Sequence, residues 1–341
     1  MTLPMGVTIS DHYEMTIQDM VEYAQLAEEL GYDGFWLTED NTKDAFVVLG
    51  VIAGQTKRIR LGTGIVNIYS RTPTTLALSA STVANAAKGR FFLALGTGGV
   101  GFMTRGHGIK IEKPLQRMRE YVSIIRRLIA GERVSHDSEL FHIEQFHLRQ
   151  PAKDAEVPIY VSALNEKMTQ LAGEIGDGVY MNFIWDRYVK DVVRPRLEAG
   201  RARAAQPRDN RTIYTLAIAP VQSDDPAAFE RVQRRVTFYC ASEHYHRVCE
   251  AGGFLKEAQR IKETWEGGDQ EGATAMVTPQ MAEAFTLYGP RERVELKLRR
   301  YADAGIYPVV YPVPRHGRTK RDYLDAITYM ADYARGAGIE R

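Results

Sequence analysis

The side chains of this sequence best suited to proton transfer are acidic residues and histidines that follow apolar segments. Glu39 and Asp40 come directly after the strand-like segment Gly34–Thr38, and His12 follows the first apolar segment. His107 lies in a loop flanked by glycines. In parallel α/β proteins the residues that follow the strands meet at one face, where substrates bind. The four are therefore candidate acids or bases.

A glycine-rich segment is the second chemical signal. Residues Gly96–Gly101 read GTGGVG and match G-x-G-x-x-G after an apolar strand, the pattern of dinucleotide-binding turns. Such a turn opens a helix at once, whereas here the next predicted helix begins only at Lys113. The glycines are better explained by a tight loop, or by a flat cofactor lying close to the backbone.

Other catalytic chemistries find little support. His244 and His246, like His142 and His147, lack the companion ligands and spacing of a zinc site, so we expect no metal. Ser162 has no G-x-S-x-G sequence around it, so acyl transfer is not predicted.

Composition narrows the class of protein. The 341 residues are 44% hydrophobic and 26% charged, with 44 Lys and Arg against 43 Asp and Glu. This balance gives no reason to expect binding to nucleic acid or to an anionic membrane. No window approaches 18 apolar residues, and no basic segment followed by an apolar run opens the sequence. We expect a cytoplasmic protein with no membrane segment.

The two cysteines suggest a reducing environment. Cys240 and Cys249 fall within one predicted helix, 226–250. Nine residues along a helix span roughly 13 Å, too far for a disulfide within that helix. We therefore expect both to be free thiols.

Short apolar strands alternate with amphipathic helices along most of the chain. Helix starts are marked by Thr16 with Asp19, and by Thr72 followed by Pro73, while Gly31 marks a helix end. Eight strands are predicted: Gly6–Ile9, Gly34–Thr38, Ile59–Val66, Phe91–Leu95, Pro158–Val161, Gly178–Met181, Ile213–Val221 and Ile306–Tyr311.

The order of these elements predicts the α/β class and a closed (β/α)8 TIM barrel. We interpret residues 1–341 as a single barrel domain with insertions at about 99–112, 131–150 and 251–285. The second insertion alternates like a hairpin, and the third is mostly helical.

Four stretches carry a resemblance to a known family. They are Gly31–Ala53, Arg58–Gly98, Val157–Val179 and, more loosely, Tyr288–Ile306. The chain resembles the luciferase-like monooxygenase superfamily of (β/α)8 barrels. Within it, the chain is most similar to the deazaflavin (coenzyme F420)-dependent branch that includes methylenetetrahydromethanopterin reductase.

The resemblance implies positions for the cofactor ring. Gly64-Ile65 occupies the place of a non-proline cis peptide bond that backs the ring in the deazaflavin enzymes. Asn67 and the Thr97-Gly98 turn match positions close to the cofactor.

The resemblance also implies where protons are exchanged. Glu39-Asp40 occupies the place where many relatives carry Asp-His, so Asp40 or Glu39 is expected to replace the histidine. Asp40 is also expected to contact the cofactor. Some relatives place a glutamate just after the fourth strand, whereas this chain has Gly99, so no acid is assigned there.

A third implied region holds the cofactor phosphate. Ser162, Ala163, Asn165, Gly178 and Val179 match it. A helix starting near Asn165 suits an anion, because the first N–H groups of a helix are free and its dipole is positive there.

Three functions remain open from the sequence. The resemblance implies an F420-dependent oxidoreductase that transfers a hydride to or from a small organic substrate, and it implies a homodimer. The alternatives are a reduced-FMN-dependent monooxygenase and a non-catalytic deazaflavin- or flavin-binding protein.

Overall fold

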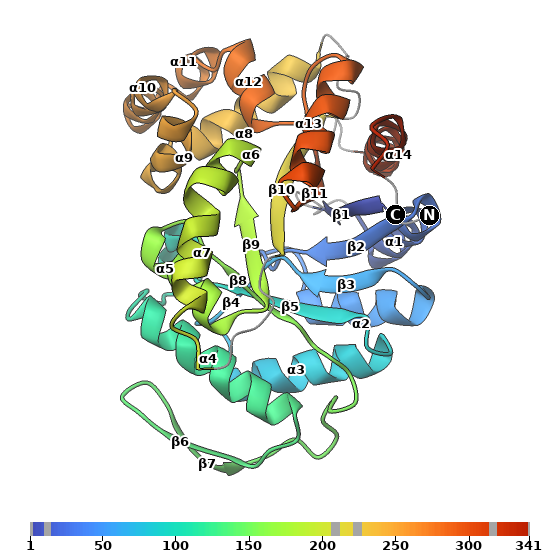
Figure 1. The fold of residues 1–341 in the computed structure, drawn as a ribbon, viewed down its shortest axis with the longest axis vertical. Coiled ribbons are helices and arrows are strands. Elements are labelled where there is room, and N and C mark those ends of the chain that lie inside the picture. The colour runs from blue at the N-terminus through green and yellow to red at the C-terminus, as the bar shows by residue number, and fades with distance from the viewer. Residues whose placement is uncertain (1–2, 10–14, 206–211, 221–226, 314–318, 340–341) are drawn as a thin grey trace.

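The computed structural model describes residues 3–9, 15–205, 212–220, 227–313 and 319–339. A closed barrel of parallel strands lies at its centre with helices around it, which confirms the predicted (β/α)8 fold (Figure 1). The barrel strands are β1 (Leu3–Ile9), β2 (Tyr32–Leu37), β3 (Arg60–Thr63), β4 (Val66–Asn67), β5 (Phe91–Gly96), β8 (Ile159–Ser162), β9 (Gly178–Asn182), β10 (Ile213–Pro220) and β11 (Ile306–Val313).

The eight predicted strands are all present, the third in two parts. Around the barrel the order is β3, β2, β1, β11, β10, β9, β8 and β5, and pairing of β3 with β5 closes the ring. The chain leaves this ladder at Gly64-Ile65 and resumes as β4, which also pairs with β5. All of these pairings are parallel.

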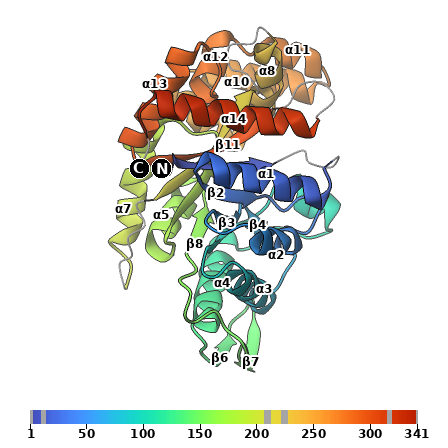
Figure 2. The same ribbon diagram turned by 90° about the vertical axis from the view of Figure 1, so that its right-hand side faces the viewer.

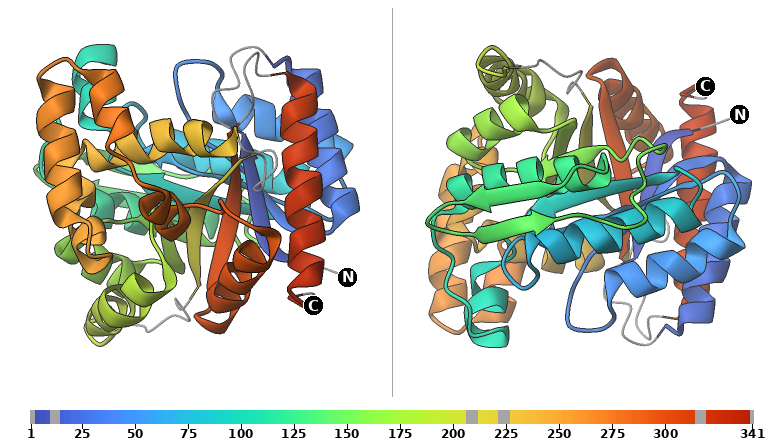
Figure 3. Two further views of the ribbon diagram at one scale, coloured as in Figure 1. Left: turned by 90° about the horizontal axis from the view of Figure 1, so that it is seen from above. Right: turned by 90° about the horizontal axis from the view of Figure 1, so that it is seen from below.

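Local sequence signals set the ends of the helices. Thr16 and Asp19 form a capping box, Gly31 ends the first helix at a φ of 90°, and Thr72 caps the helix that Pro73 begins. Figure 2 shows α2 and α3 side by side on one flank, and Figure 3 shows α14 beside α1. The main helices are α1 (Ile17–Leu30), α2 (Ala45–Gln55), α3 (Pro73–Ala86), α4 (Pro114–Ile129), α5 (Glu166–Ile175), α6 (Asp186–Tyr188), α7 (Arg194–Arg201), α8 (Ala228–Cys240), α13 (Arg291–Asp303) and α14 (Lys320–Gly336).

Aromatic rings fill the barrel interior. Trp36 is fully buried, and its ring centre lies 3.9 Å from that of Phe92, 4.8 Å from Tyr180 and 4.5 Å from Tyr214. Large flat side chains packed in this way make the barrel a solid core and not a pore.

Polar side chains close the amino end of the barrel. Arg60 forms an ion pair with Asp33 and donates a hydrogen bond to the hydroxyl of Tyr214 (2.6 Å). These residues, with Tyr160 and Tyr307, line a pocket of about 270 Å³. Burial raises the pKa of Tyr160 to about 12, so its hydroxyl stays protonated.

The predicted insertions have the expected character. Residues 131–150 contain the antiparallel strands β6 (Val134–Asp137) and β7 (His142–Phe146). Residues 251–285 form α10 (Leu255–Glu266), α11 (Gln270–Ala275) and α12 (Pro279–Phe285), and Figure 1 shows them at the opposite end of the molecule from the hairpin. Within 99–112 lies a π-helical turn, η1 (Phe102–Gly106).

The prediction that the two cysteines share a helix is wrong. Helix α8 ends at Cys240, the chain turns through the short 3₁₀ helix η3 (Glu243–Tyr245), and α9 (His246–Ala251) carries Cys249. This reversal brings the two sulfur atoms within 3.8 Å of each other, as buried free thiols. The distance argument against a disulfide therefore fails.

In the described part of the chain, no helix has the length and apolar character needed to cross a membrane.

Candidate active site

The interruption of the third strand is held against the end of β2 by three hydrogen bonds. The N–H of Gly64 donates to the carbonyl of Leu37 (2.8 Å), and the Thr38 hydroxyl donates to the carbonyl of Gly64 (2.7 Å). The N–H of Glu39 donates to the carbonyl of Ile65 (3.0 Å). The Gly64-Ile65 bond is cis, as the resemblance implies.

Small residues surround Ile65 at this level of the barrel. A Cβ atom on Gly96 would lie 2.9 Å from Ile65 Cδ1 and 3.3 Å from the Cβ of Ser162. Gly64, Ile65, Gly96 and Ser162 therefore form one surface at the carboxyl end of the strands, which we call the platform. Its only large side chain is Ile65, which is partly exposed.

Tyr180 supports the platform from inside the barrel. A Cβ atom on Gly64 would lie 2.8 Å from the Tyr180 hydroxyl oxygen, a separation that atoms do not adopt without a shift. Tyr180 is 2% exposed, and burial raises the pKa of its hydroxyl. That hydroxyl has no hydrogen-bond partner among the described residues. Only glycine at position 64 leaves room for this ring.

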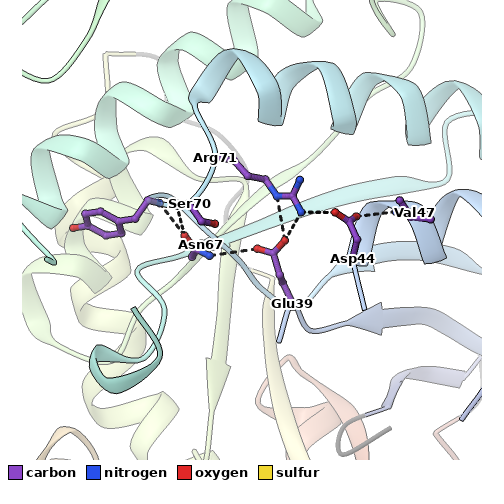
Figure 4. Close-up of polar contacts among 7 residues, drawn as sticks. Glu39, Asp44, Val47, Asn67, Ser70 and Arg71 are labelled. Atoms are coloured by element: carbon purple, nitrogen blue, oxygen red, sulfur yellow. Dashed lines mark hydrogen bonds and ion pairs between the residues drawn. The ribbon is translucent and has the colours of Figure 1, made fainter. Parts of the chain in front are cut away.

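A charged network borders the platform. Arg71 contacts Glu39 through Nε (3.1 Å) and Nη2 (2.6 Å), and Nη2 also contacts Asp44 (2.7 Å) (Figure 4). The second oxygen of Glu39 accepts a hydrogen bond from Asn67 Nδ2 (3.3 Å). Glu39 is thus held by Asn67, the last residue of β4, and by Arg71 on the loop that follows. Its carboxylate is an anchoring group with little freedom to approach a substrate.

The electrostatics of the network favour its charged forms. Burial alone would raise the pKa of Asp44, but hydrogen bonds from Arg71 and from the Val47 N–H hold it below its ordinary value. Burial would lower the pKa of Arg71, yet hydrogen bonds to Asp44 and Glu39 raise it. Asp44 and Arg71 therefore stay ionised near neutral pH.

Asn67 shapes the backbone of this loop. It is 3% exposed, and its Oδ1 accepts hydrogen bonds from the N–H groups of Tyr69 (2.9 Å) and Ser70 (2.7 Å). With Nδ2 on Glu39, both ends of the side chain are engaged. Asn67 lies beside the platform, and its side chain organises the loop.

Asp40 and His107 line one pocket next to this network. The pocket has a volume of about 480 Å³, and Glu39, Lys43 and Arg71 also line it. Asp40 accepts hydrogen bonds from the N–H (2.8 Å) and hydroxyl (2.5 Å) of Thr42, which orient its carboxylate. The structure thus brings three of the four candidate proton-transfer residues together.

His12 lies outside the described residues. Across the described part of the chain, no three His, Cys, Asp or Glu side chains gather as a metal site would require.

The turn after β5 also belongs to this face. Gly98 has a φ of 72°, and a Cβ there would lie 3.4 Å from the Cβ of Asn67 and 3.0 Å from the sulfur of Met103. The buried Met103 of η1 therefore fixes how the Thr97-Gly98 turn folds back. Thr97 and Gly98 directly follow Gly96 at the platform edge.

The five residues matched to the phosphate region do not lie together. Ser162 ends β8 at the carboxyl end of the barrel, and Ala163 and Asn165 follow it. Asn165 caps α5 by accepting a hydrogen bond from the Met168 N–H (2.9 Å).

Gly178 and Val179 begin β9 near the other end of the barrel. Gly178 is level with Tyr160, which lines the pocket at the amino end. Val179 is fully buried between the strands and the outer helices. These two positions are therefore left out of the phosphate site.

Sequence reasoning missed two functional positions. Arg71 stands in the segment that carries the resemblance, but nothing in the spacing showed that it pairs with Glu39. Tyr180 reads as an ordinary apolar strand residue, and only the closed barrel shows that its ring reaches Gly64. The polar residue Asn182, at the end of the same strand, was the available signal that β9 contributes to this face.

The fold agrees with comparisons to known proteins. The profile of the luciferase-like monooxygenase family matches residues 1–307. A 5,10-methylenetetrahydromethanopterin reductase from Archaeoglobus fulgidus is 32% identical over 309 residues, which cover 88% of this chain and 91% of that protein. The chain therefore belongs to the luciferase-like monooxygenase family.

Two solved structures illustrate the range of that fold. The coenzyme F420-dependent tetrahydromethanopterin reductase from Methanopyrus kandleri matches with a TM-score of 0.81 and 22% identity, over 96% of this chain and 97% of that one. The oxygenating constituent of a diketocamphane monooxygenase from Pseudomonas putida, in complex with FMN, matches with a TM-score of 0.67 and 17% identity, over 97% of each chain. At these identities, both structures show the shared fold.

We predict that Gly64→Ala disturbs the platform, because its Cβ would collide with Tyr180. Overpacking of this kind costs about 1–3 kcal/mol of unfolding free energy. The matched control is Gly54→Ala on α2, where a Cβ meets nothing within 4 Å. That change should stabilise the helix by about 0.5–1 kcal/mol. Urea unfolding of both variants checks the prediction, and equal stabilities would contradict the placement of Tyr180 beneath Gly64.

Proposed function

We propose that this chain is an F420-dependent oxidoreductase that transfers a hydride between the deazaflavin and a small organic substrate. The observation that carries the proposal is the platform at the carboxyl end of the barrel, beside a pocket lined by Asp40 and His107. The 32% identity to a methylenetetrahydromethanopterin reductase supports the same reaction class.

The residues present fit a flat, anionic cofactor. Ile65 offers an apolar contact for the ring, while Gly64, Gly96 and Ser162 leave the space beside it open. Asn67, Thr97 and Gly98 border the ring, and Ser162, Ala163 and Asn165 lie where α5 begins and can receive the phosphate. When bound, the deazaflavin supplies the hydride chemistry, and the protein supplies orientation and proton exchange.

Asp40 is the proposed proton-transfer residue. Glu39 and Asp40 both line the pocket with His107. Arg71 and Asn67 tie the Glu39 carboxylate to the neighbouring strand and loop, whereas the Asp40 carboxylate accepts hydrogen bonds from the adjacent Thr42. Glu39 is accordingly a positioning residue that ties the end of β2 to the loop after β4. His12 remains a candidate from the sequence alone.

Binding of F420 in preference to FMN tests the proposal. We expect F420 to bind with a Kd of about micromolar or lower in a fluorescence titration, and FMN to bind at least tenfold more weakly. Preference for FMN, with oxygen uptake by the reduced complex, would make the chain a monooxygenase of the same family. Tight F420 binding without turnover of any substrate would favour a binding protein.

We predict that Asp40→Asn lowers kcat by about 100-fold or more, because loss of a positioned acid or base costs that much. The Kd for F420 should change less than threefold. Turnover is measured with reduced F420 and 5,10-methylenetetrahydromethanopterin, the substrate in the name of the similar reductase. The control Glu39→Gln should lower kcat less than tenfold. A larger loss in the control would move the proton-transfer role to Glu39.

The homodimer is proposed on the outer face of α2 and α3. Helix α2 contains no charged residue, although Val47 is 60% and Val51 is 42% exposed. Leu78 on the neighbouring α3 is 54% exposed. A helix that is apolar all round is normally covered, and a second copy of this face would cover it. The single-domain organisation and the cytoplasmic location also stay predictions.

We predict that the protein sediments at twice its chain mass of 38.4 kDa. The double variant Val47→Glu, Val51→Glu should sediment as a monomer, because two like charges placed on α2 cannot be buried without partners. Leu296→Lys, on α13 at a similarly exposed apolar position, should leave the dimer intact. A double variant that remains dimeric would place the interface elsewhere.

A further inference from the structure

Helix α8 carries three large polar side chains on one face. Arg231, Arg235 and Tyr239 are spaced four residues apart, which places side chains on the same side of a helix. The insertion helices α10, α11 and α12 pack against another side of α8, where the amide of Gln233 donates to the carbonyl of Val277 (3.0 Å). The face with the two arginines is therefore turned away from the insertion.

Tyr239 places this face of α8 at the carboxyl end of β9. Its hydroxyl accepts a hydrogen bond from the Nδ2 of Asn182, the last residue of that strand (3.2 Å). Its ring is stacked on Phe183, which follows (centroids 4.7 Å apart, 23° between planes). Figure 3 (left) shows α8, in yellow, lying across the strands. The helix thus covers one side of the barrel mouth, the open space at the carboxyl ends of the strands.

Arg235 lies over a side chain that points into the barrel. Its Cζ is 5.2 Å from the ring centre of Tyr311 on β11. Tyr307 and Val309 of the same strand pack with the aromatic rings of the barrel interior, and side chains two residues apart share one face of a strand. Tyr311 is therefore the next interior residue towards the carboxyl end. The Arg235 guanidinium consequently lies at the barrel mouth.

Arg235 and the platform lie on opposite walls of this mouth. The platform residues belong to the junction of β3 and β4, to β5 and to β8, which are neighbours in the ring. Strands β11 and β10 are across from them in the ring order β3, β2, β1, β11, β10, β9, β8, β5. A molecule in the mouth therefore has Ile65 on one side and the stacked pair of Tyr311 and Arg235 on the other.

The two walls differ in charge. The pocket beside the platform is lined by three carboxylates and two cationic side chains, which are Glu39, Asp40 and Asp44, and Lys43 and Arg71. The opposite wall carries Arg231 and Arg235, both partly exposed. This difference orients a substrate with an anionic end, because the reverse pose would bring the anion next to Asp40.

A guanidinium can stack on a ring and bind an anion at the same time. Its face contacts Tyr311, whereas its five N–H donors lie at the edge of its plane. That edge matches the two oxygen atoms of a carboxylate or phosphate, to which arginine donates two parallel hydrogen bonds. Tyr311 is buried, so the ring that holds the plane of Arg235 is itself held by the barrel.

We propose that Arg235 determines substrate specificity by binding a carboxylate or phosphate group at the end of the substrate that faces α8. The proposal rests on the proposed function, because it takes the reacting part of the substrate to lie between this wall and the cofactor ring. The cofactor phosphate is assigned to the start of α5, after β8, so the anion at Arg235 belongs to the substrate. Arg231, one turn earlier on the same face, adds positive charge.

The neighbouring arginine provides a matched control. Arg234 has the same charge on the same helix, but it is 68% exposed and pairs with Glu230 on the surface (3.5 Å). In Arg235→Ala we expect the KM for 5,10-methylenetetrahydromethanopterin to rise about tenfold or more, because a charge-assisted hydrogen bond is lost. The Kd for F420 should change less than about twofold, and Arg234→Ala should change both constants less than about twofold. Equal KM values in the two variants overturn the proposal.

Two further measurements make the result specific to an anion. Arg235→Lys keeps the charge and should recover part of the lost affinity, whereas Arg235→Gln should not. In the wild type, added KCl should raise the KM, since salt screens the attraction between the two charges. If Arg235→Ala fails to fold, a wild-type KM that is insensitive to KCl overturns the proposal. A rise in the Kd for F420 without a rise in the KM overturns the assignment to the substrate.

Failure of the proposed function is read from the wild type, which would then bind no F420. The anion site is in that case tested without a cofactor, by melting curves in inorganic phosphate and in KCl of the same ionic strength. Phosphate should raise the melting temperature of the wild type and of Arg234→Ala more than that of Arg235→Ala, because a bound ligand stabilises the folded state. An equal rise in all three proteins overturns the anion site.

Discussion

The hydrogen bonds between the end of β2 and residues 64–65 are the constraint on which the rest of the site depends. They replace the regular pairing of the third strand with its neighbours at the carboxyl end of the barrel. Ile65 is thereby partly exposed among small residues. Backbone groups that leave a ladder need new partners, and Leu37, Thr38 and Glu39 provide them. Asp40, the next residue after Glu39, lines the neighbouring pocket.

Two rigid supports flank the platform. On one side, Arg71 forms ion pairs with Glu39 and Asp44, which join the loop after β4 to the loop after β2. Across the barrel mouth, Phe183 and its stacked partners fix the end of β9. A reaction that depends on the orientation of a flat ring is favoured when the residues around the ring are held in fixed positions.

Much of the fold could be predicted from the sequence, because each element carries its own signal. Thr72 with Pro73 marks a helix start, and apolar runs between turns mark the strands. The cis bond at Gly64-Ile65 was predicted from the family resemblance. The hydrophobic pattern of the sequence carries no information on whether a peptide bond is cis or trans. These features are local, and local sequence describes them well.

The failures concern contacts between distant residues. The approach of Cys240 to Cys249 depends on a reversal over five residues without Gly or Pro, so one continuous helix was the natural interpretation. Gly178 matched a family segment but starts its strand at the wrong end for the site. The approach of the Tyr180 ring to Gly64 exists only once the barrel closes.

A crystal structure of the protein with bound F420 tests the central claim most directly. The account predicts that the deazaflavin ring lies against Ile65 on the platform, with Asp40 on the side from which the substrate enters. A ring bound elsewhere, such as in the pocket at the amino end beside Arg60, or a ring without contact to residues 64–65, would contradict it.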